Sequence, residues 1–245
     1  MGYKICLVSP DQSISRTAAE VVRELGSDLR CDLTIIDGNV QTSVKNVRPY
    51  VENGVDAIIS RGGTAMALKE AYPDVPVIAI QIEATDILKA IRTFPKGTKI
   101  GLISYSEIVY QYQAVAELLG AHDITFFRLF QLGDEDKEID QYVQDACNQG
   151  IEALIGSIHV RSCAKKYNLK FAFLSSGKNA ILHAIREAAA TTIVRQHDQD
   201  AFRLIADIVN YTFMGTAVFD RQGNLQTWNP AFAAMFPYEE EKTWK

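Results

Sequence analysis

The chain has 245 residues, enough for one large domain or two to three smaller ones, and its 47% of hydrophobic residues can form buried cores. A net charge of −5 and the lack of any run rich in Lys and Arg argue against nucleic acid as a partner of this chain. Its apolar runs are far shorter than the roughly 20 residues of a membrane span and no signal-peptide pattern precedes the first strand, so we expect a cytoplasmic protein without membrane contact.

The first half of the chain alternates strands and helices. Apolar runs predict strands at Tyr3–Val8, Cys31–Ile36, Asp56–Ser60 and Val75–Ile80. Helices are expected through Glu20–Leu25, capped by Ser13 or Ser15, and at Val44–Asn53, Thr64–Ala71 and Thr85–Thr93. This alternation predicts a parallel sheet with right-handed crossovers.

The second half repeats this order after a break at Pro95–Thr98. Its expected strands are Lys99–Ser104, Ile124–Phe130, Ala153–Gly156 and Phe171–Leu174. Its expected helices are Ile108–Leu119, Asp136–Gln149, Val160–Tyr167 and Asn179–Ala190.

Three pairs of similar segments relate the two halves at a nearly constant offset of about 95 residues. The pairs are Lys4–Ser9 with Lys99–Ser104, Gly54–Ser60 with Gly150–Gly156, and Asp86–Ile91 with Ala180–Ile185. Chance does not readily produce three matches in the same order. The sequence therefore predicts an α/β protein of two tandem α/β/α lobes with parallel four-stranded sheets, and a ligand site between them.

The chain changes character after about residue 190. Ala201–Thr212 has apolar residues at helical spacing, and Gly215–Pro230 reads as a hairpin followed by a short helix at Ala231–Phe236. Some 30 residues cannot close a sheet, so we expect the start of a truncated domain. The expected domains are 1–95, 96–195, a linker helix at 196–214 and an incomplete domain at 215–245.

Ser60–Arg61–Gly62–Gly63–Thr64 is the most specific local motif. It follows the third strand, and ligands bind beyond the carboxyl ends of strands in open parallel sheets. The glycines allow close approach of the backbone, Thr64 can cap the next helix, and the helix N-terminus with Arg61 can hold a carboxylate or phosphate. A tight turn with an Arg in solvent is the alternative. The matching Ser157–Val160 has neither the Arg nor the glycines.

Polar residues at the other strand ends are expected to meet in the same place. Each could instead be a helix cap, but together these hydroxyls and helix N-termini favour an acidic ligand that bears hydroxyls. The further candidate ligand contacts are Ser9, Glu83, Thr85, Ser104, Tyr105, Ser157, His159, Ser175 and Ser176.

No metal, cofactor or catalytic motif stands out in the sequence. His159 and Cys163 are four residues apart, but no further His or Cys lies near them to complete a metal site. The four cysteines are scattered and are expected to be reduced, mostly buried thiols. The sequence lacks the GxxxxGK[ST], GxSxG and HExxH patterns, so we expect no metal and no cofactor.

Ser60–Thr64, Pro76–Ile78, Asp86–Leu88 and the tandem repeat together resemble the N-terminal sensor domain of propionate-catabolism activators, which are sigma-54-dependent transcriptional regulators. The resemblance spans roughly residues 3–190. It implies two chelatase-like lobes and an effector, 2-methylcitrate in the best-known members, held chiefly by Ser60, Arg61, Gly62, Gly63 and Thr64. Gly215–Phe236, with Trp228–Pro230, resembles the opening of a PAS domain.

The resemblance also implies partners. An AAA+ ATPase and a helix-turn-helix, both outside this chain, would act on sigma-54 RNA polymerase and DNA, so this region would bind a small carboxylate effector and neither hydrolyse ATP nor touch DNA. We expect a homodimer.

Two other readings remain open. A cofactor-independent racemase would need a thiol in each lobe at matching strand ends, and those loops contain no Cys, so an enzyme is not expected. A purely structural dimerisation module would use the amphipathic helix near residue 205 but would leave the polar, glycine-lined site unexplained.

Overall fold

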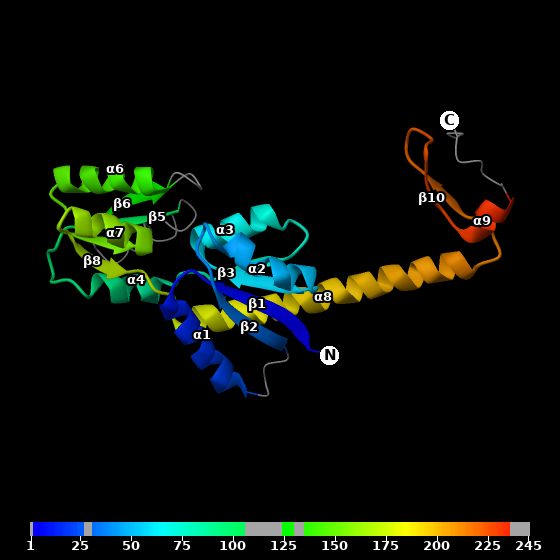
Figure 1. The fold of residues 1–245 in the computed structure, drawn as a ribbon, viewed down its shortest axis with the longest axis horizontal. Coiled ribbons are helices and arrows are strands. Elements are labelled where there is room, and N and C mark those ends of the chain that lie inside the picture. Colours follow the sequence, from blue (N-terminus) through cyan, green and yellow to red (C-terminus); the bar gives the residue numbers. More distant parts are fainter. Residues whose placement is uncertain (1, 27–30, 106–123, 130–134, 236–245) are drawn as a thin grey trace. The chain divides into compact units, whose positions relative to one another are not determined.

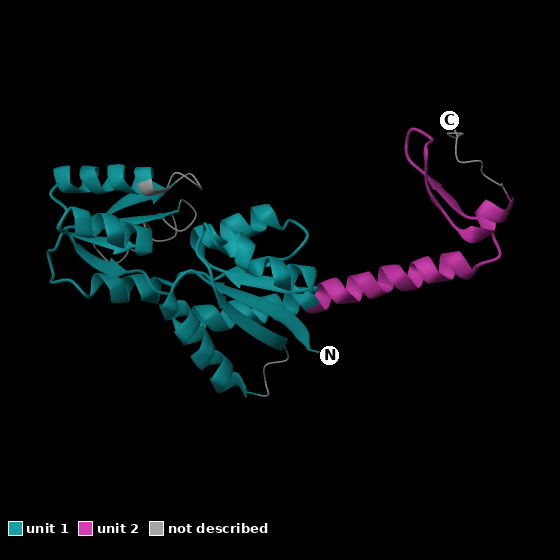
Figure 2. Ribbon diagram, viewed as in Figure 1, with its two compact units in different colours: residues 1–192 teal, residues 193–245 magenta. Residues whose placement is uncertain are grey.

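Two parallel sheets with the same strand order organise the first part of the protein. The computed structural model describes residues 2–26, 31–105, 124–129 and 135–235. The chain divides into unit 1, Met1–Thr192, and unit 2, Ile193–Lys245 (Figure 2). None of the helices within the described residues is long and apolar enough to cross a membrane.

Lobe one of unit 1 is built on a sheet of order β2-β1-β3-β4. Its strands are β1 (Tyr3–Ser9), β2 (Cys31–Asp37), β3 (Ala57–Ser60) and β4 (Val77–Ala79). Each strand is followed in the sequence by a helix: α1 (Gln12–Leu25), α2 (Ser43–Glu52), α3 (Gly62–Ala71) and α4 (Ala84–Ile91). Five consecutive residues of β1 are buried, because helices cover both faces of the sheet. The four predicted strands are confirmed to within a few residues.

Lobe two repeats this arrangement, with a sheet of order β6-β5-β7-β8. Its elements are β5 (Ile100–Tyr105), β6 (Ile124–Leu129), α6 (Glu135–Asn148), β7 (Ala153–Gly156), α7 (Ile158–Lys166), β8 (Lys170–Phe173) and α8 (Lys178–Tyr211). The repeat extends to single hydrogen bonds: the Asp56 amide donates to the Lys4 carbonyl (2.8 Å), and the Glu152 amide to the Lys99 carbonyl (2.9 Å). The predicted helix Ile108–Leu119 lies outside the described residues.

The two lobes exchange their last helices. α4, which ends the first half of the sequence, packs Ile87 and Ala90 against the lobe-two strand residues Leu102 and Ile155. α8, which ends the second half, packs its first turns, including Ile181 and Ile185, on the lobe-one sheet (Figure 1). The packed halves therefore differ from the expected domains 1–95 and 96–195, which followed the repeat.

The other faces of both sheets are covered by helices of their own lobe. α2 and α3 lie on lobe one, over Cys6, Val8 and Ile58. α6 and α7 lie on lobe two, over Ile103 and Leu154. Unit 1 is thus two tandem α/β/α lobes with parallel four-stranded sheets, which confirms the predicted fold class.

Three local predictions were wrong. Asp11, not Ser13 or Ser15, caps α1, because its Oδ1 accepts hydrogen bonds from the amides of Ser13 (2.8 Å) and Ile14 (3.3 Å). α8 is one helix of 34 residues where two were predicted. The intervening residues 191–200 contain no Gly or Pro to interrupt it. The third wrong prediction is the cap of α3, which lies in the candidate functional site.

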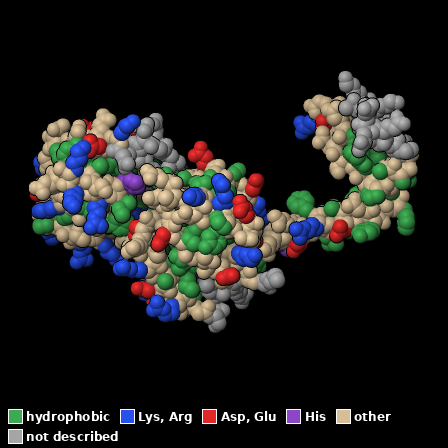
Figure 3. Space-filling model, in the orientation of Figure 1, with side chains coloured by type: hydrophobic (Ala, Val, Ile, Leu, Met, Phe, Trp, Pro, Cys, Tyr) green, Lys and Arg blue, Asp and Glu red, His purple; other side chains and the backbone are tan. Residues whose placement is uncertain are grey.

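Unit 2 contains the predicted hairpin and short helix. β9 (Ala217–Phe219) and β10 (Leu225–Trp228) pair antiparallel, and α9 (Pro230–Met235) follows. The side chain and amide of Asn224 donate to Asp220 in the turn, and these hydrogen bonds, led by the side-chain one, lower the pKa of the Asp220 carboxyl. Hydrophobic side chains such as Phe202, Ile205 and Ile208 are exposed along the unit-2 part of α8 (Figure 3).

Candidate functional site

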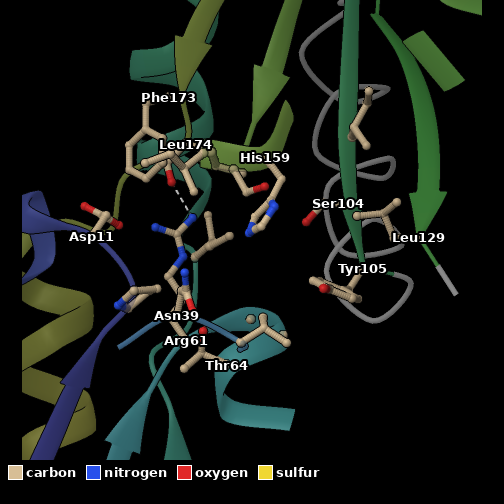
Figure 4. Close-up of a pocket in the computed structure, with 18 residues that line it drawn as sticks. Asp11, Asn39, Arg61, Thr64, Ser104, Tyr105, Leu129, His159, Phe173 and Leu174 are labelled. Carbon is tan, nitrogen blue, oxygen red and sulfur yellow. Dashed lines mark hydrogen bonds between the residues drawn. The ribbon is translucent and has the colours of Figure 1, made fainter. Parts of the chain in front are cut away.

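A pocket lies at the carboxyl ends of the strands of both lobes in unit 1 (Figure 4). Its cavity volume is about 90 Å³. Residues of both lobes line it: Pro10, Asp11, Asn39, Val40, Arg61, Gly62, Gly63, Thr64, Ile82, Ile103, Ser104, Tyr105, Leu129, Ser157, Ile158, His159, Phe173 and Leu174.

The start of α3 forms the lobe-one wall. Arg61 has extended backbone and holds the N-cap position without a side-chain cap hydrogen bond. Gly62 follows with φ +52°, a conformation that disfavours any side chain. Thr64 lies within the helix, so its predicted role as the cap is wrong, although it does line the pocket. The early amides of α3 therefore lack a side-chain acceptor from the cap residue.

Arg61 reaches from lobe one to the segment that follows β8. Its Nη2 donates a hydrogen bond to the carbonyl oxygen of Leu174. Its guanidinium carbon lies 5.9 Å from the centroid of the Phe173 ring, within the range of a cation–π contact. Figure 4 shows the guanidinium amid the lining residues, with the hydrogen bond to Leu174 drawn as a dashed line.

The start of α7 forms the matching wall of lobe two. Ser157 is its N-cap, again without a side-chain cap hydrogen bond, and Ile158 and His159 begin the helix. A Cβ on Gly156 would lie 2.7 Å from Val160 Cγ2 and 3.0 Å from the Ile103 carbonyl oxygen, so only glycine fits this close approach of β7 to α7. The N-termini of α3 and α7 both border the pocket and offer partial positive charge to an anion.

Eight of the fourteen predicted ligand contacts line the pocket. They are Arg61, Gly62, Gly63, Thr64, Ser104, Tyr105, Ser157 and His159. Whether any of them binds a ligand remains a prediction.

The other six lie elsewhere. Ser60 is buried and donates from Oγ to the Val8 carbonyl (2.8 Å), joining β3 to β1. Ser9 Oγ donates to the Asp11 carbonyl (2.5 Å) and borders a neighbouring pocket.

Glu83, Thr85, Ser175 and Ser176 belong to the segments that cross between the lobes or to the helix that follows. Glu83 forms a capping box at α4 with Asp86, and Thr85 Oγ1 donates to Glu83 Oε2 (3.3 Å). Ser175 is exposed. Ser176 is buried, and its Oγ has no hydrogen-bond partner among the described residues. Because the chain changes lobe here, these polar side chains leave the pocket while their apolar neighbours Ile82 and Leu174 line it.

Sequence reasoning missed the apolar part of the lining. Ile103, Leu129 and Phe173 lie at or near the ends of strands, and apolar residues there resemble core residues. It also missed Asn39 and Val40, which follow β2 in the same way that Arg61 follows β3. The Gly38–Asn39 turn was the available signal, since polar turns at the ends of parallel strands commonly border sites.

A second pocket, of about 720 Å³, adjoins the first. The two share Pro10, Asp11, Asn39, Ile158 and Phe173. The second pocket adds Arg161, an exposed residue of α7.

The described residues provide neither a cluster of metal-ligand side chains nor a thiol in the first pocket. They contain no group of three or more His, Cys, Asp or Glu side chains arranged to hold a metal ion. No cysteine is among the described residues that line the first pocket. An opposed pair of thiols is therefore not found in the described lining.

Comparisons with known proteins agree with this architecture. A crystal structure of an NtrC family transcriptional regulator from Clostridium acetobutylicum is 25% identical, with a TM-score of 0.64 over 80% of this chain and 99% of that one. Glutamate racemase from Aquifex pyrophilus is 18% identical, with a TM-score of 0.35 over 74% of this chain and 82% of the other, a distant likeness that says nothing of function. No curated protein matches the chain.

The family model described as propionate catabolism activator matches residues 27–198. This match takes in most of both lobes and most of the pocket lining. It indicates a sensing region of a transcriptional regulator and points away from an enzyme. The chain belongs to the propionate catabolism activator family.

Proposed function

We propose that unit 1 binds a small carboxylic acid as effector in the pocket between its lobes, and that binding controls further domains of a transcriptional activator. The position of Arg61 is the observation that carries this proposal. It lies in the pocket beside the N-terminus of α3, in a family of regulators. A guanidinium holds a carboxylate with two parallel hydrogen bonds, and a helix N-terminus adds positive potential.

The contact between Arg61 and Leu174 suggests how binding acts on the fold. Leu174 precedes the segment that leads from lobe two into α8, and α8 continues into unit 2. An effector that favours one arrangement of the lobes would shift the equilibrium by its differential affinity, typically about 1–3 kcal/mol. α8 is the element through which such a shift would leave unit 1.

The remaining roles follow from the family resemblance. We assign 196–214 as the linker, of which 196–211 are the last turns of α8, and 215–245 as the opening of a PAS domain, supported by the hairpin β9–β10 and helix α9. Sigma-54 RNA polymerase and DNA would be engaged by other domains of a cytoplasmic, dimeric regulator. The exposed apolar residues of α8 favour dimerisation as an accompanying role.

A thermal-shift screen of the 245-residue protein tests the proposal. The panel contains 2-methylcitrate, which the resemblance implies, together with citrate, propionate and other small acids. An acid at 100 times its dissociation constant adds about 2.7 kcal/mol to the free energy of unfolding, a shift of a few degrees. The shift should vanish in Arg61→Ala. If no acid raises the melting temperature, the proposed function is wrong.

A further inference from the structure

The pocket lining says more about the acid than that it carries a carboxylate. We propose that the effector has one carboxylate and a hydrocarbon body, in preference to a compact acid with several carboxylates. This inference rests on the proposed function, because it concerns the ligand of the same pocket. Three observations carry it: the charge of the lining, the position of the apolar side chains, and the place of Arg161.

The charge of the lining suits one carboxylate. Arg61 is the single Lys or Arg among the described lining residues, and Asp11 contributes a charge of the opposite sign. The N-termini of α3 and α7 add roughly half a positive charge each. The segments 106–123 and 130–134, which follow β5 and β6 in sequence, contain no Lys or Arg. Within this pocket, a second carboxylate would therefore lose its hydration without gaining a second cationic partner.

Apolar side chains form the rest of the wall. Ile158 and Phe173 contribute partly exposed apolar surface, and Ile82, Ile103, Leu129 and Leu174, which are almost fully buried, form the apolar layer behind it. Such a surface excludes water and favours hydrocarbon. Hydroxyl groups of a ligand could still bond Ser104 or Thr64, but they would face a lining that is apolar in large part.

The two kinds of lining lie in different places. In Figure 4 Arg61 and Asp11 are on one side, and Tyr105 and Leu129 stand on the other, with the His159 ring between Arg61 and Ser104 in this view. An acid with its carboxylate on Arg61 would direct its body toward Tyr105 and Leu129. A guanidinium carries five N–H donors, so Arg61 can hold the Leu174 carbonyl and a carboxylate together.

Arg161 serves as a control for Arg61, because it is a second arginine close to the same pocket. It lines the adjoining pocket, which shares Asp11 and Phe173 with the first, but it does not line the first. Only an acid that extends a second carboxylate out of the first pocket into the adjoining one would use Arg161. An acid of the proposed class would not.

Isothermal titration calorimetry on the 245-residue protein tests the inference with six probes. Hexanoate and phenylacetate carry one carboxylate and a hydrocarbon body, hexanol and phenylethanol are their uncharged counterparts, and tricarballylate and citrate carry several carboxylates. We expect the two monocarboxylates to bind at least about tenfold more tightly than the alcohols and than the tricarboxylates. Arg61→Gln should remove this preference for the acids, and Arg161→Gln should leave it unchanged.

A second variant probes the apolar wall. Ile158 is 45% exposed, so Ile158→Thr should fold normally. It should weaken the monocarboxylates several-fold and leave the tricarboxylates unaffected.

The outcomes distinguish the proposed effector class from the proposed function. Tighter binding of tricarballylate or citrate, or an equal loss in Arg61→Gln and Arg161→Gln, would overturn the inference and leave the proposed function standing. Failure of every acid, those of the thermal-shift screen included, would overturn both.

Discussion

Arg61 Nη2 donates a hydrogen bond to the Leu174 carbonyl oxygen, which links the end of β3 in lobe one to the end of β8 in lobe two. The acceptor is a backbone atom at the start of the segment that crosses to α8. The side chain best placed to hold a carboxylate thus already touches a place where the chain changes lobe. The proposed carboxylate contact and this contact between the lobes therefore share one guanidinium.

Arg61→Lys separates charge from geometry. Lysine keeps the positive charge but loses the planar fork that can hold a carboxylate and the Leu174 carbonyl together. We expect the affinity for the acid to fall roughly tenfold or more. The melting temperature without ligand should change little, because one hydrogen bond contributes only about 1 kcal/mol. Titration calorimetry and thermal unfolding measure the two effects, and unchanged affinity would show that a point charge suffices.

The burial of side chains along α8 predicts which part of this helix stabilises the core of lobe one. Ile181 is fully buried against lobe one, whereas Ile208 on the same helix is 63% exposed. Ile181→Ala should lower the free energy of unfolding by about 2–4 kcal/mol, and Ile208→Ala by less than about 0.5 kcal/mol. Urea unfolding at a concentration that keeps the protein monomeric measures both. Equal losses would contradict the packing of α8 on lobe one.

The helix exchange also predicts which fragment can fold. Residues 1–95 contain all the strands of lobe one but lack the first turns of α8, which cover one face of its sheet. We expect this fragment to be unfolded or aggregated. A fragment that joins 1–81 to 178–192 through a flexible linker should fold, since it restores the core around Ile181 and Ile185. Circular dichroism and cooperative thermal unfolding distinguish the two, and a stable 1–95 would argue against the exchange.

The exchange shows what sequence patterns can and cannot predict here. Apolar runs and the repeat predicted the strands and the paired lobes, because those signals are local or follow from comparing two halves of one chain. The apolar face of α4, with Ile87 and Ala90, indicates burial but not which sheet it covers. The connection through Gln81–Glu83 is compatible with either sheet, so tertiary packing decides.

The same limit applies to the pocket. The Arg–Gly–Gly motif was visible because its residue types are unusual at the end of a buried strand. Ile82 and Phe173 were not, because an apolar residue at a strand end has the same pattern whether it faces a core or a ligand. The polar residues Glu83 and Ser176 were predicted to line the site because they are polar and follow predicted strands, but the crossing segments carry them elsewhere.

Buried thiols predict a loss of stability at alkaline pH. Burial in the core around β1 raises the pKa of the Cys6 thiol from its usual 9.0 to about 12. Between these values the unfolded chain releases the proton and the folded chain keeps it, so the free energy of unfolding falls as pH rises. Burial raises the pKa of Cys31 as well, in the same direction.

The urea midpoint should therefore fall between about pH 8 and about pH 10, and less steeply in Cys6→Ala than in the parent. The comparison between the two proteins removes the contribution of Lys and Tyr side chains that titrate in both. Identical slopes would show that Cys6 ionises as readily in the folded protein as in the unfolded one.

We expect the side-chain hydrogen bonds of Asn229 to stabilise unit 2. The residue is fully buried, and its Nδ2 donates to the carbonyls of Val209 and Met214, each at 2.8 Å. Its Oδ1 accepts from the amides of Thr216 (2.8 Å) and Phe232 (2.9 Å). One side chain therefore ties the end of α8, the start of the hairpin and the first turn of α9, where Pro230 occupies the first helical position.

Asn229→Asp retains the acceptor that caps α9 but turns a carboxylate oxygen toward the Val209 and Met214 carbonyls. We expect a loss of about 1–3 kcal/mol, confined to unit 2 because the two units form separate compact bodies. Hydrogen exchange of the β9 and β10 amides should accelerate while that of β1 and β5 stays unchanged. Asn224→Ala is the control, since Asn224 Nδ2 bonds only the exposed Asp220 carboxylate and its loss should affect the turn alone. Slow exchange retained in Asn229→Asp would mean that the hairpin holds its place through apolar packing instead.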